Sequence, residues 1–360
     1  MLYNSADLIM KIHLLSGFLG SGKTTAIHQA VYILLNQNKK VGVITNDQGV
    51  HLVDGDFFKA IGIPGRQVIN GCFCCNYNDL DKNIQSLIDT NDTQIIFAES
   101  VGSCTDIVAT VLKPLLQHRP GATVTVSTFT DIRLLQMMLA KKHSFDEAIA
   151  YIYFKQLEEA SIIIINKIDL TDADTIQKVE ATMKKNYPGK MLIFQNSLDE
   201  QSIGNWLNTL DNYSKTQLPA SLKIDYDVYA EGEAKLAWLD ESLEIFSHSN
   251  SALEDAQQLI TTIYKKITGD HYNIGHLKFL VDEKHKISFT STSNQIPNLP
   301  VTSKPTTTVL VNIRVETTPG KIKALVEEAI KQTENETGCK ILVNSIDVFQ
   351  PGYPTPVYRM

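Results

Sequence analysis

Short apolar runs alternate with longer amphipathic stretches through the first two hundred residues of the chain. The runs are rich in β-branched residues and predict β-strands at 12–15, 41–45, 94–98, 123–129, 161–165 and 191–194. The stretches between them have apolar positions at helical spacing and predict helices at 24–35, 80–88, 107–116, 132–142, 145–159 and 175–187. This order predicts an α/β fold, with a mostly parallel, doubly wound sheet covered by helices on both faces.

A polar stretch with a proline, at 212–222, separates this pattern from a different one. We place a domain boundary here, between a domain of residues 1–215 and a domain of residues 216–360. The second half predicts a strand or hairpin at 234–247, then a helix, three strands, a helix and a last strand at 343–350. That order is typical of a C-terminal α+β domain of the ferredoxin-like type with one extra strand.

Composition and charge narrow the class of protein. The chain has 360 residues, 43% of them hydrophobic and 20% charged, as expected for two globular domains. Its net charge of −7 argues against general binding to nucleic acid or an anionic membrane. The chain has neither a basic segment ahead of an apolar core nor an apolar run long enough to span a membrane, so we expect a cytoplasmic protein. In that compartment its five cysteines are expected to stay reduced.

The segment "GFLGSGKT" at 17–24 fits the phosphate-binding pattern G-x-x-x-x-G-K-[ST] and lies between a predicted strand and a predicted helix. Glycines allow the backbone N–H groups to wrap around phosphate oxygens. We expect Lys23 to reach the β- and γ-phosphates and the Thr24 hydroxyl to bind Mg²⁺. The predicted phosphate-binding residues are Gly17, Gly20, Ser21, Gly22, Lys23, Thr24 and Thr25.

The segment "NKID" at 166–169 follows a predicted buried strand and indicates a preference for guanine. The Asp169 carboxylate would accept hydrogen bonds from the guanine edge, whereas adenine would leave it unpaired. Asn166 completes the motif, and the aliphatic stem of Lys167 would cover the base. Asn196 and Ser197 end the next strand and are further candidates for the base edge. The alternative is an ordinary polar turn at the end of a strand.

Two acidic residues follow predicted strands, Asp47 in "ITNDQG" and Glu99 in "FAESVG". Ligands bind at the carboxyl ends of the strands in such sheets, so both carboxylates should lie near the γ-phosphate. We expect one of them to help hold Mg²⁺ and the other to orient the attacking water. The alternative is that each caps the helix that follows it.

Three of the five cysteines are Cys72, Cys74 and Cys75, directly after a turn-prone Asn-Gly pair. A turn there would let the sulfurs converge on one ion, at bonds of about 2.3 Å. Three soft ligands suit Zn²⁺ or a similar ion and leave a fourth position for an exchanging ligand. Buried structural cysteines or a redox pair are the alternatives. The isolated Cys104 and Cys339 are interpreted as small core residues.

In this order, "GFLGSGKTT", "NDQG", "GCFCC", "ESVG" and "NKID" resemble the CobW-like family of GTPases, relatives of the hydrogenase- and urease-maturation GTPases. The resemblance covers residues 11–200 and implies a metallochaperone whose metal ligands are the three clustered cysteines. It also implies guanine recognition by Asn166, Lys167 and Asp169. The chain departs from the family in having Asp47 where a glutamate is usual, and the "HLKF" of 276–279 matches a family signature only loosely.

We therefore expect a GTPase that uses Mg²⁺, with Lys23, Glu99 and Asp47 as catalytic residues and Thr24 and Asp47 as Mg²⁺ ligands. It would bind Zn²⁺ or Co²⁺ at the cysteines and couple GTP or GDP binding to delivery of the metal. The expected partners are a guanine nucleotide, a client metalloprotein or cofactor-pathway protein docking on the C-terminal domain, and a second copy in a nucleotide-dependent homodimer. The alternatives are a non-enzymatic metal buffer or sensor and, with less support, a P-loop kinase.

Overall fold

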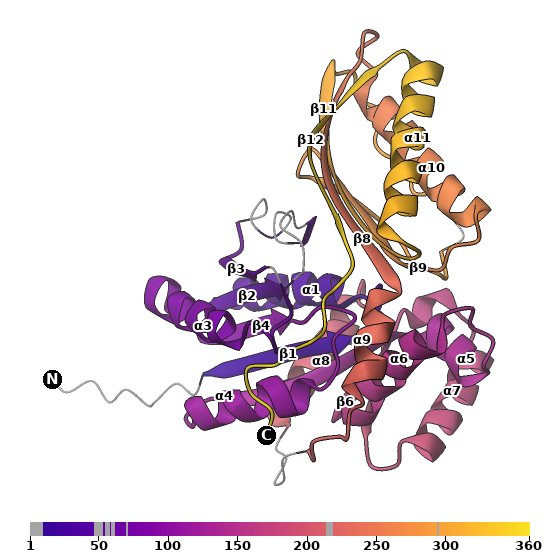
Figure 1. The fold of residues 1–360 in the computed structure, drawn as a ribbon. Helices are drawn as coiled ribbons and strands as arrows, with labels where there is room; N and C mark the ends of the chain where they lie inside the picture. The colour runs from indigo at the N-terminus through magenta and orange to yellow at the C-terminus, as the bar shows by residue number, and fades with distance from the viewer. Residues whose placement is uncertain are drawn as a thin grey trace, which may run out of the picture.

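The computed structural model describes residues 10–46, 53–54, 58, 62–69, 71–213, 219–293 and 295–360. Two β-sheets organise these residues into two lobes (Figure 1). The first lobe, residues 10–234, is built on a seven-stranded sheet, and the second lobe, residues 236–349, on a five-stranded sheet. The remaining residues, 350–360, form a C-terminal tail that returns from the second lobe to the first (Figure 1).

The first sheet is parallel throughout and has the order β3-β2-β4-β1-β5-β6-β7. This confirms the predicted doubly wound α/β fold. The short edge strand β3 was not predicted, because its sequence "GRQV" has no apolar run. The strands are β1 (Lys11–Gly17), β2 (Val41–Asn46), β3 (Gly65–Val68), β4 (Ile95–Glu99), β5 (Thr123–Asp131), β6 (Ile162–Asn166) and β7 (Met191–Gln195).

Helices cover both faces of this sheet. One face packs against α1 (Lys23–Asn36) and α8 (Glu200–Asn212), and the other against five helices and a π-helical turn. Successive side chains of β1 point to opposite faces, so Leu14 belongs to one core and Leu15 to the other. The elements of the second face are α3 (Tyr77–Asn91), η1 (Val108–Leu112), α4 (Lys113–His118), α5 (Ile132–Leu139), α6 (Glu147–Glu159) and α7 (Ala173–Asn186).

Two helices of the first lobe were not predicted. In α8, Ile203, Trp206 and Leu210 are buried at helical spacing, but the many polar residues between them obscured the pattern. The second, α9 (Tyr226–Ala234), follows the predicted boundary at 215 in sequence and packs against α6. The two helices approach closely at Gly232 of α9, where an added Cβ would lie 2.5 Å from the carbonyl oxygen of Ala148 in α6.

The second sheet is antiparallel, with the order β10-β9-β11-β8-β12. Without the edge strand β10 this is the order of a ferredoxin-like sheet, so the predicted fold with one extra strand is confirmed. The elements in chain order are β8 (Leu236–Phe246), α10 (Ala252–Gly269), β9 (Ile274–Val281), β10 (His285–Phe289), β11 (Thr306–Glu316), α11 (Pro319–Thr337) and β12 (Lys340–Phe349).

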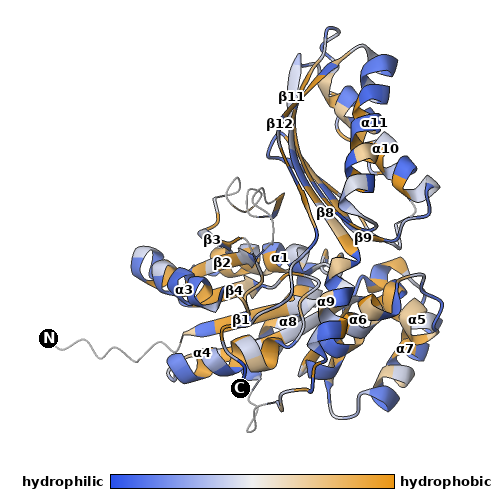
Figure 2. Ribbon diagram, viewed as in Figure 1, coloured by the Kyte–Doolittle hydropathy of each residue, from blue (hydrophilic) through white to orange (hydrophobic). Residues whose placement is uncertain are grey.

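The helices α10 and α11 lie side by side on one face of this second sheet (Figure 1). Their hydrophilic residues lie on the outer side, and their apolar residues face the strands (Figure 2). Ile260 and Ile263 of α10 and Val326 of α11 are buried in the same core as Val311 and Ile313 of β11. Each lobe therefore has a core of its own. Among the described residues no helix is both long and apolar enough to cross a membrane.

A buried ion pair in the second lobe gives a stability prediction. Nη1 of Arg314 lies 2.6 Å from Oδ1 of Asp240, both side chains are fully buried, and the guanidinium stacks 3.8 Å from the Trp238 ring. Asp240→Ala would leave a buried cation without its partner, so we expect the free energy of unfolding to fall by about 3–5 kcal/mol. Urea unfolding followed by circular dichroism measures this loss.

The control is Glu180→Ala, which removes an exposed ion pair with Lys184 on α7. Its expected effect is below about 0.5 kcal/mol, since exposed pairs contribute little. An equally small effect of Asp240→Ala would show that the buried pair does not stabilise the second lobe.

Candidate functional site

The loop between β1 and α1 depends on three glycines with positive φ angles, of 121° at Gly17, 71° at Gly20 and 95° at Gly22. An added Cβ at Gly17 would lie 2.1 Å from the carbonyl oxygen of Phe129, and one at Gly22 would lie 2.3 Å from Nδ2 of Asn166. A side chain at Gly17 or Gly22 is therefore excluded both by the positive φ angle and by the close neighbouring atoms. The loop wraps around the N-terminus of α1, as the motif predicts.

Lys23 and Thr24 open α1, and both are buried. Lys23 donates through Nζ to the carbonyl oxygen of Gly17 at 2.6 Å. Thr24 donates through Oγ1 to the Glu99 carboxylate, 2.9 Å from Oε2 and 3.0 Å from Oε1. Neighbouring oxygens around a Mg²⁺ ion with bonds of about 2.1 Å lie about 3 Å apart, so the hydroxyl and carboxylate fit such an ion.

Burial shifts the pKa values of Lys23 and Glu99 in the direction that favours the neutral form of each side chain. It lowers the pKa of Lys23 to about 8, an effect that the charge of Glu99 partly offsets. Burial raises the pKa of Glu99, and the negative charge of Asp54 raises it further. A phosphate bound in the loop would favour the charged form of Lys23, because it places negative charge against a desolvated ammonium group.

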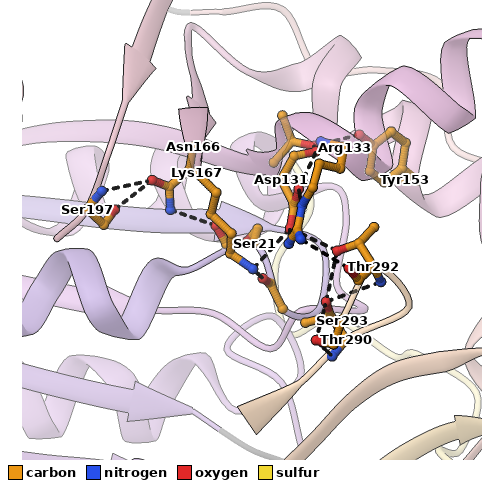
Figure 3. Close-up of polar contacts among 12 residues, drawn as sticks. Ser21, Asp131, Arg133, Tyr153, Asn166, Lys167, Ser197, Thr290, Thr292 and Ser293 are labelled. Atoms are coloured by element: carbon orange, nitrogen blue, oxygen red, sulfur yellow. Dashed lines mark hydrogen bonds and ion pairs between the residues drawn. The ribbon is translucent and has the colours of Figure 1, made fainter. Parts of the chain in front are cut away.

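Asn166, at the end of β6, links the glycine loop to the loop after β7 (Figure 3). Its Nδ2 donates to the carbonyl oxygen of Ser21 at 2.9 Å. Its Oδ1 accepts from the Ser197 backbone N–H at 3.1 Å and from the Ser197 hydroxyl at 2.8 Å. One hydrogen-bond network therefore links candidate residues for binding the phosphates to candidate residues for binding the base.

Lys167 has a left-handed backbone, with φ of 63°, and its Nζ donates to the carbonyl oxygen of Gly20 at 2.7 Å. The same Nζ lies 3.0 Å from Oδ2 of Asp131. Burial by itself would raise the pKa of Asp131, but the hydrogen bond from Arg133 and the charge of Lys167 outweigh it and hold the pKa below its usual value. The side chain of Lys167 therefore lies across the glycine loop (Figure 3).

The glycine loop, Asp169 and Asn196 line one cavity of about 410 Å³. Asp169 lies on the short helical turn η2 (Ile168–Leu170) and is exposed. Oδ1 of Asn196 accepts a hydrogen bond from the Leu198 backbone N–H at 2.9 Å. The volume and the mixed polar lining suit a small-molecule ligand. Thr25 and Glu99 line the same cavity.

The second lobe forms the opposite wall of this cavity, and sequence reasoning missed its residues. Lys278 of β9 and Lys286 of β10 line it, and both pair with Asp54 of the first lobe. Thr290 packs so closely that a Cβ at Gly20 would lie 2.3 Å from its Cγ2 atom. The loosely matching "HLKF" segment was the available signal for Lys278, but the sequence alone did not place it near the glycine loop.

The three clustered thiols form a second site. Cys72 and Cys74 are buried and Cys75 is half-buried. The Sγ atoms of Cys72 and Cys75 lie 3.5 Å apart, those of Cys74 and Cys75 lie 3.7 Å apart, and all three lie within 4.8 Å of one another. Sulfurs around a tetrahedral Zn²⁺ ion with bonds of about 2.3 Å lie about 3.8 Å apart, so the thiols already fit such an ion.

The Asn46 side chain holds the turn that brings these sulfurs together. Its Nδ2 donates to the carbonyl oxygen of Gly71 at 2.7 Å, and its Oδ1 accepts from the Phe73 backbone N–H at 2.8 Å. Asn46 ends β2, so the cysteine turn is fixed to the same edge of the sheet as the candidate nucleotide-binding residues. The predicted acid Asp47 lies outside the described residues, and its division of roles with Glu99 stays a prediction.

Cys104 lies in the core of the first lobe, as expected for a small core residue. It shares that buried core with Cys72 and Cys74. Cys339 lies in the core of the second lobe, as expected for a small core residue.

The C-terminal tail covers the outer side of the thiol cluster. The Thr355 backbone N–H donates to Sγ of Cys75 at 3.3 Å, and the Val357 N–H donates to the Cys74 carbonyl oxygen at 2.9 Å. A cavity of about 490 Å³ lies beneath the tail, lined by the thiol residues Cys72 and Cys75, the acids Glu233 and Asp347, and tail residues 351–355.

The sheet order, the glycine loop and the residues around it define a P-loop nucleotide-binding protein. Residues 11–194, just over half of the chain, match the family described as CobW/HypB/UreG, nucleotide-binding domain. The chain belongs to this family, as the order of its motifs indicated.

Among curated proteins, the chain is similar to the zinc chaperone YeiR of Escherichia coli, with 26% identity over 59% of this chain and 62% of that protein. It is also similar to the zinc chaperone CobW of Sinorhizobium sp., with 26% identity over 46% of this chain and 52% of that protein. A shorter match, to the zinc chaperone YjiA of Escherichia coli, has 36% identity over 26% of this chain and 30% of that protein. The matched part thus spans less than two thirds of each of these relatives.

Among solved structures, HypB from Helicobacter pylori in complex with nickel has 18% identity and a TM-score of 0.41, over 58% of this chain and 92% of that one. The hydrogenase maturation factor HypB from Archaeoglobus fulgidus has 20% identity and a TM-score of 0.39, over 57% of this chain and 89% of that one. Likenesses at this level imply nothing about activity, and the fold assignment follows from the sheet order itself.

The position of the tail predicts its effect on thiol reactivity. Deleting residues 351–360 removes the Thr355 N–H from Cys75 and opens the cavity above Cys72. We expect both thiols to react several-fold faster with iodoacetamide, because access limits the reaction of a covered thiol. Mass spectrometry of quenched samples measures the rates. Cys339 is the internal control and should react at the same rate in both proteins, whereas an unchanged rate at Cys75 would show that the tail does not shield it.

Proposed function

We propose that this protein is a GTP-hydrolysing metallochaperone that carries Zn²⁺, or Co²⁺ as a similar ion, and delivers it to a client in a nucleotide-dependent way. One observation carries the proposal: three thiols at metal-ligand spacing sit on a turn held by Asn46, at the same sheet edge as the nucleotide candidates. The names of the curated relatives, which are zinc chaperones, support the choice of metal.

The proposed nucleotide contacts follow from the cavity. The glycine loop and the N-terminus of α1 offer N–H groups to phosphates. Asp169 is exposed at the cavity and is proposed to read the guanine edge, with Lys167 over the base and Asn196 and Ser197 beside it. Lys278 and Lys286 would add positive charge from the second lobe, which gives that lobe a direct means of sensing the phosphates.

Hydrolysis is proposed to use charge stabilisation around the γ-phosphate. Lys23 would leave its contact with Gly17 and pair with the phosphate oxygens. Thr24, with Glu99 or Asp47, would hold Mg²⁺, which would neutralise developing charge on the phosphate. The carboxylate that is not bound to the metal would orient the attacking water.

The thiol cluster is proposed to hold the cargo. A divalent ion replaces the thiol protons, so uptake should release protons and depend on pH. The reduced state that this requires fits the cytoplasm, where we place the protein. The proposed recipient is a client metalloprotein or cofactor-pathway protein, docking on the C-terminal domain of residues 216–360. A nucleotide-dependent homodimer is part of the same proposal.

Nucleotide choice tests the base-reading role of Asp169. Asp169→Asn exchanges a carboxylate acceptor for an amide, so we expect GTP affinity to fall at least about tenfold and xanthine-nucleotide affinity to rise. Competition against a fluorescent GDP analogue measures both affinities. Asp174→Asn, on the exposed surface of α7, is the matched control and should change neither. Equal competition by ATP and GTP in the unaltered protein would refute guanine recognition.

Coupling between nucleotide and metal tests the chaperone mechanism. A typical coupling free energy of about 1–3 kcal/mol would change the Zn²⁺ affinity by about 5–150-fold between the GDP state and a state with a non-hydrolysable GTP analogue. Titration of Zn²⁺ against a chromophoric chelator in both states measures the ratio. The Cys74→Ser variant should lose tight binding in both states. Equal affinities in the unaltered protein would instead favour a metal buffer whose nucleotide has no effect on the metal.

A further inference from the structure

Asp54 of the first lobe forms an ionic bridge with two lysines of the second lobe. Its Oδ2 lies 2.5 Å from Nζ of Lys278 and its Oδ1 lies 2.5 Å from Nζ of Lys286, and the three side chains are between 15% and 19% exposed. Burial by itself would raise the pKa of Asp54, but the charges of the two lysines outweigh it and hold this pKa well below its usual value. The bridge therefore joins one carboxylate to two ammonium groups.

The strand register places both lysines on one face of the second sheet. Lys278 of β9 lies directly opposite Ser288 of β10, and Lys286 precedes Ser288 by two residues on the same strand. Alternate residues of a strand share a face, so these three side chains point the same way. All three line the cavity of about 410 Å³ that also contains Lys23 and Thr24 of the glycine loop.

The strands that carry the lysines pack on the glycine loop. An added Cβ at Gly275, near the start of β9, would lie 2.7 Å from Cδ1 of Leu19 in that loop. An added Cβ at Gly20 would lie 2.3 Å from Cγ2 of Thr290, which directly follows β10. The lysines therefore form a wall of the cavity whose position relative to the loop is fixed by close contacts.

His276 of β9 adds an unsatisfied polar atom to this wall. Its side chain is 5% exposed and lines the cavity, and its Nε2 atom has no hydrogen-bond partner among the described residues. A buried polar atom without a partner costs free energy. A ligand oxygen in the cavity would remove this cost by accepting from Nε2, in the tautomer that carries its proton there.

We propose that Lys278 and Lys286 are ligands of the γ-phosphate, and that Asp54 occupies their ammonium groups until a nucleoside triphosphate takes its place. The inference rests on the proposed function, since it takes triphosphate binding at the glycine loop as given. A terminal phosphate brings about two negative charges and three acceptor oxygens, whereas a carboxylate brings one charge and two oxygens. The phosphate therefore satisfies two ammonium groups better than Asp54 does.

This exchange distinguishes a triphosphate from a diphosphate. A diphosphate in the glycine loop has no γ-phosphate and leaves the bridge of Asp54 intact. The Val53 N–H donates to Oδ1 of Asn312 in β11 at 3.0 Å, so the backbone beside Asp54 has a bond to the second lobe that does not involve the lysines. Exchange of the carboxylate for a phosphate breaks the two ion pairs and leaves this bond in place.

Three variants, each measured with two nucleotides, test the exchange. Lys278→Gln and Lys286→Gln should each lower the affinity for a non-hydrolysable GTP analogue at least about tenfold, because each removes a charged hydrogen bond to the γ-phosphate. Asp54→Asn should raise that affinity at least about threefold, because it removes the carboxylate that competes for the lysines. The GDP affinity should change less than about twofold in all three variants, since GDP makes no contact with the lysines. Competition against a fluorescent GDP analogue measures these affinities.

The matched control is Lys284→Gln, which removes an exposed lysine from the turn between β9 and β10 and should change neither affinity. If Asp54→Asn weakens binding of the GTP analogue or leaves it unchanged, the bridge only joins the two lobes and the exchange is overturned. Equal losses of GDP and analogue affinity in the lysine variants overturn the γ-phosphate contact. If the unaltered protein binds neither nucleotide, the proposed function itself is refuted, which is a different result from these two.

A crystal structure of the unaltered protein with the GTP analogue and Mg²⁺ tests the same point without a variant that has to fold. Lysine Nζ atoms within about 3 Å of γ-phosphate oxygens, with the Asp54 carboxylate turned away from them, support the proposal. An intact bridge between Asp54 and both lysines beside the bound analogue overturns it.

Discussion

The parallel register of the first sheet is the constraint on which both candidate sites depend. In parallel strands all carboxyl ends meet at one edge of the sheet. The pairings of Leu15 with Glu99 and of Asp131 with Asn166 place Glu99, the glycine loop and the "NKID" segment at that edge. Asn46 ends the neighbouring strand β2 at the same edge and fixes the cysteine turn there. A shift of one residue in any of these strands would turn its terminal side chain to the other face.

Two short connections join the nucleotide pocket to the thiol cluster. The first is Asn46, the first residue of the "NDQG" segment, whose side chain holds the cysteine turn. The second is the segment from Glu99 to Cys104, which contacts the glycine loop at one end and shares a buried core with Cys72 and Cys74 at the other. Both connections are only a few residues long, and Asn46 and Glu99 each end a strand of the first sheet.

The second lobe contacts both sites through different elements. Near the nucleotide pocket, the Thr292 hydroxyl donates to Oδ2 of Asp131, and Arg133 donates to the Thr292 carbonyl oxygen (Figure 3). At the thiols, the tail that continues β12 lies over Cys75 and ends with an ion pair between Arg359 and Asp106. Elements of the second lobe and its tail therefore contact the first lobe at both candidate sites.

The sequence by itself determined the elements with strong local patterns. The alternation of apolar runs and helical stretches predicted the parallel sheet, and the glycine loop and "NKID" were visible because their chemistry requires fixed residues at fixed spacing. It did not show α8, whose few apolar residues are diluted by polar ones, or the lysines of β9 and β10 at the pocket. Nor did it show that Cys104 shares a buried core with Cys72 and Cys74, about thirty residues away in the chain. Only tertiary structure decides such contacts, because they depend on how separate strands and loops pack, and the local sequence does not specify which distant residues meet.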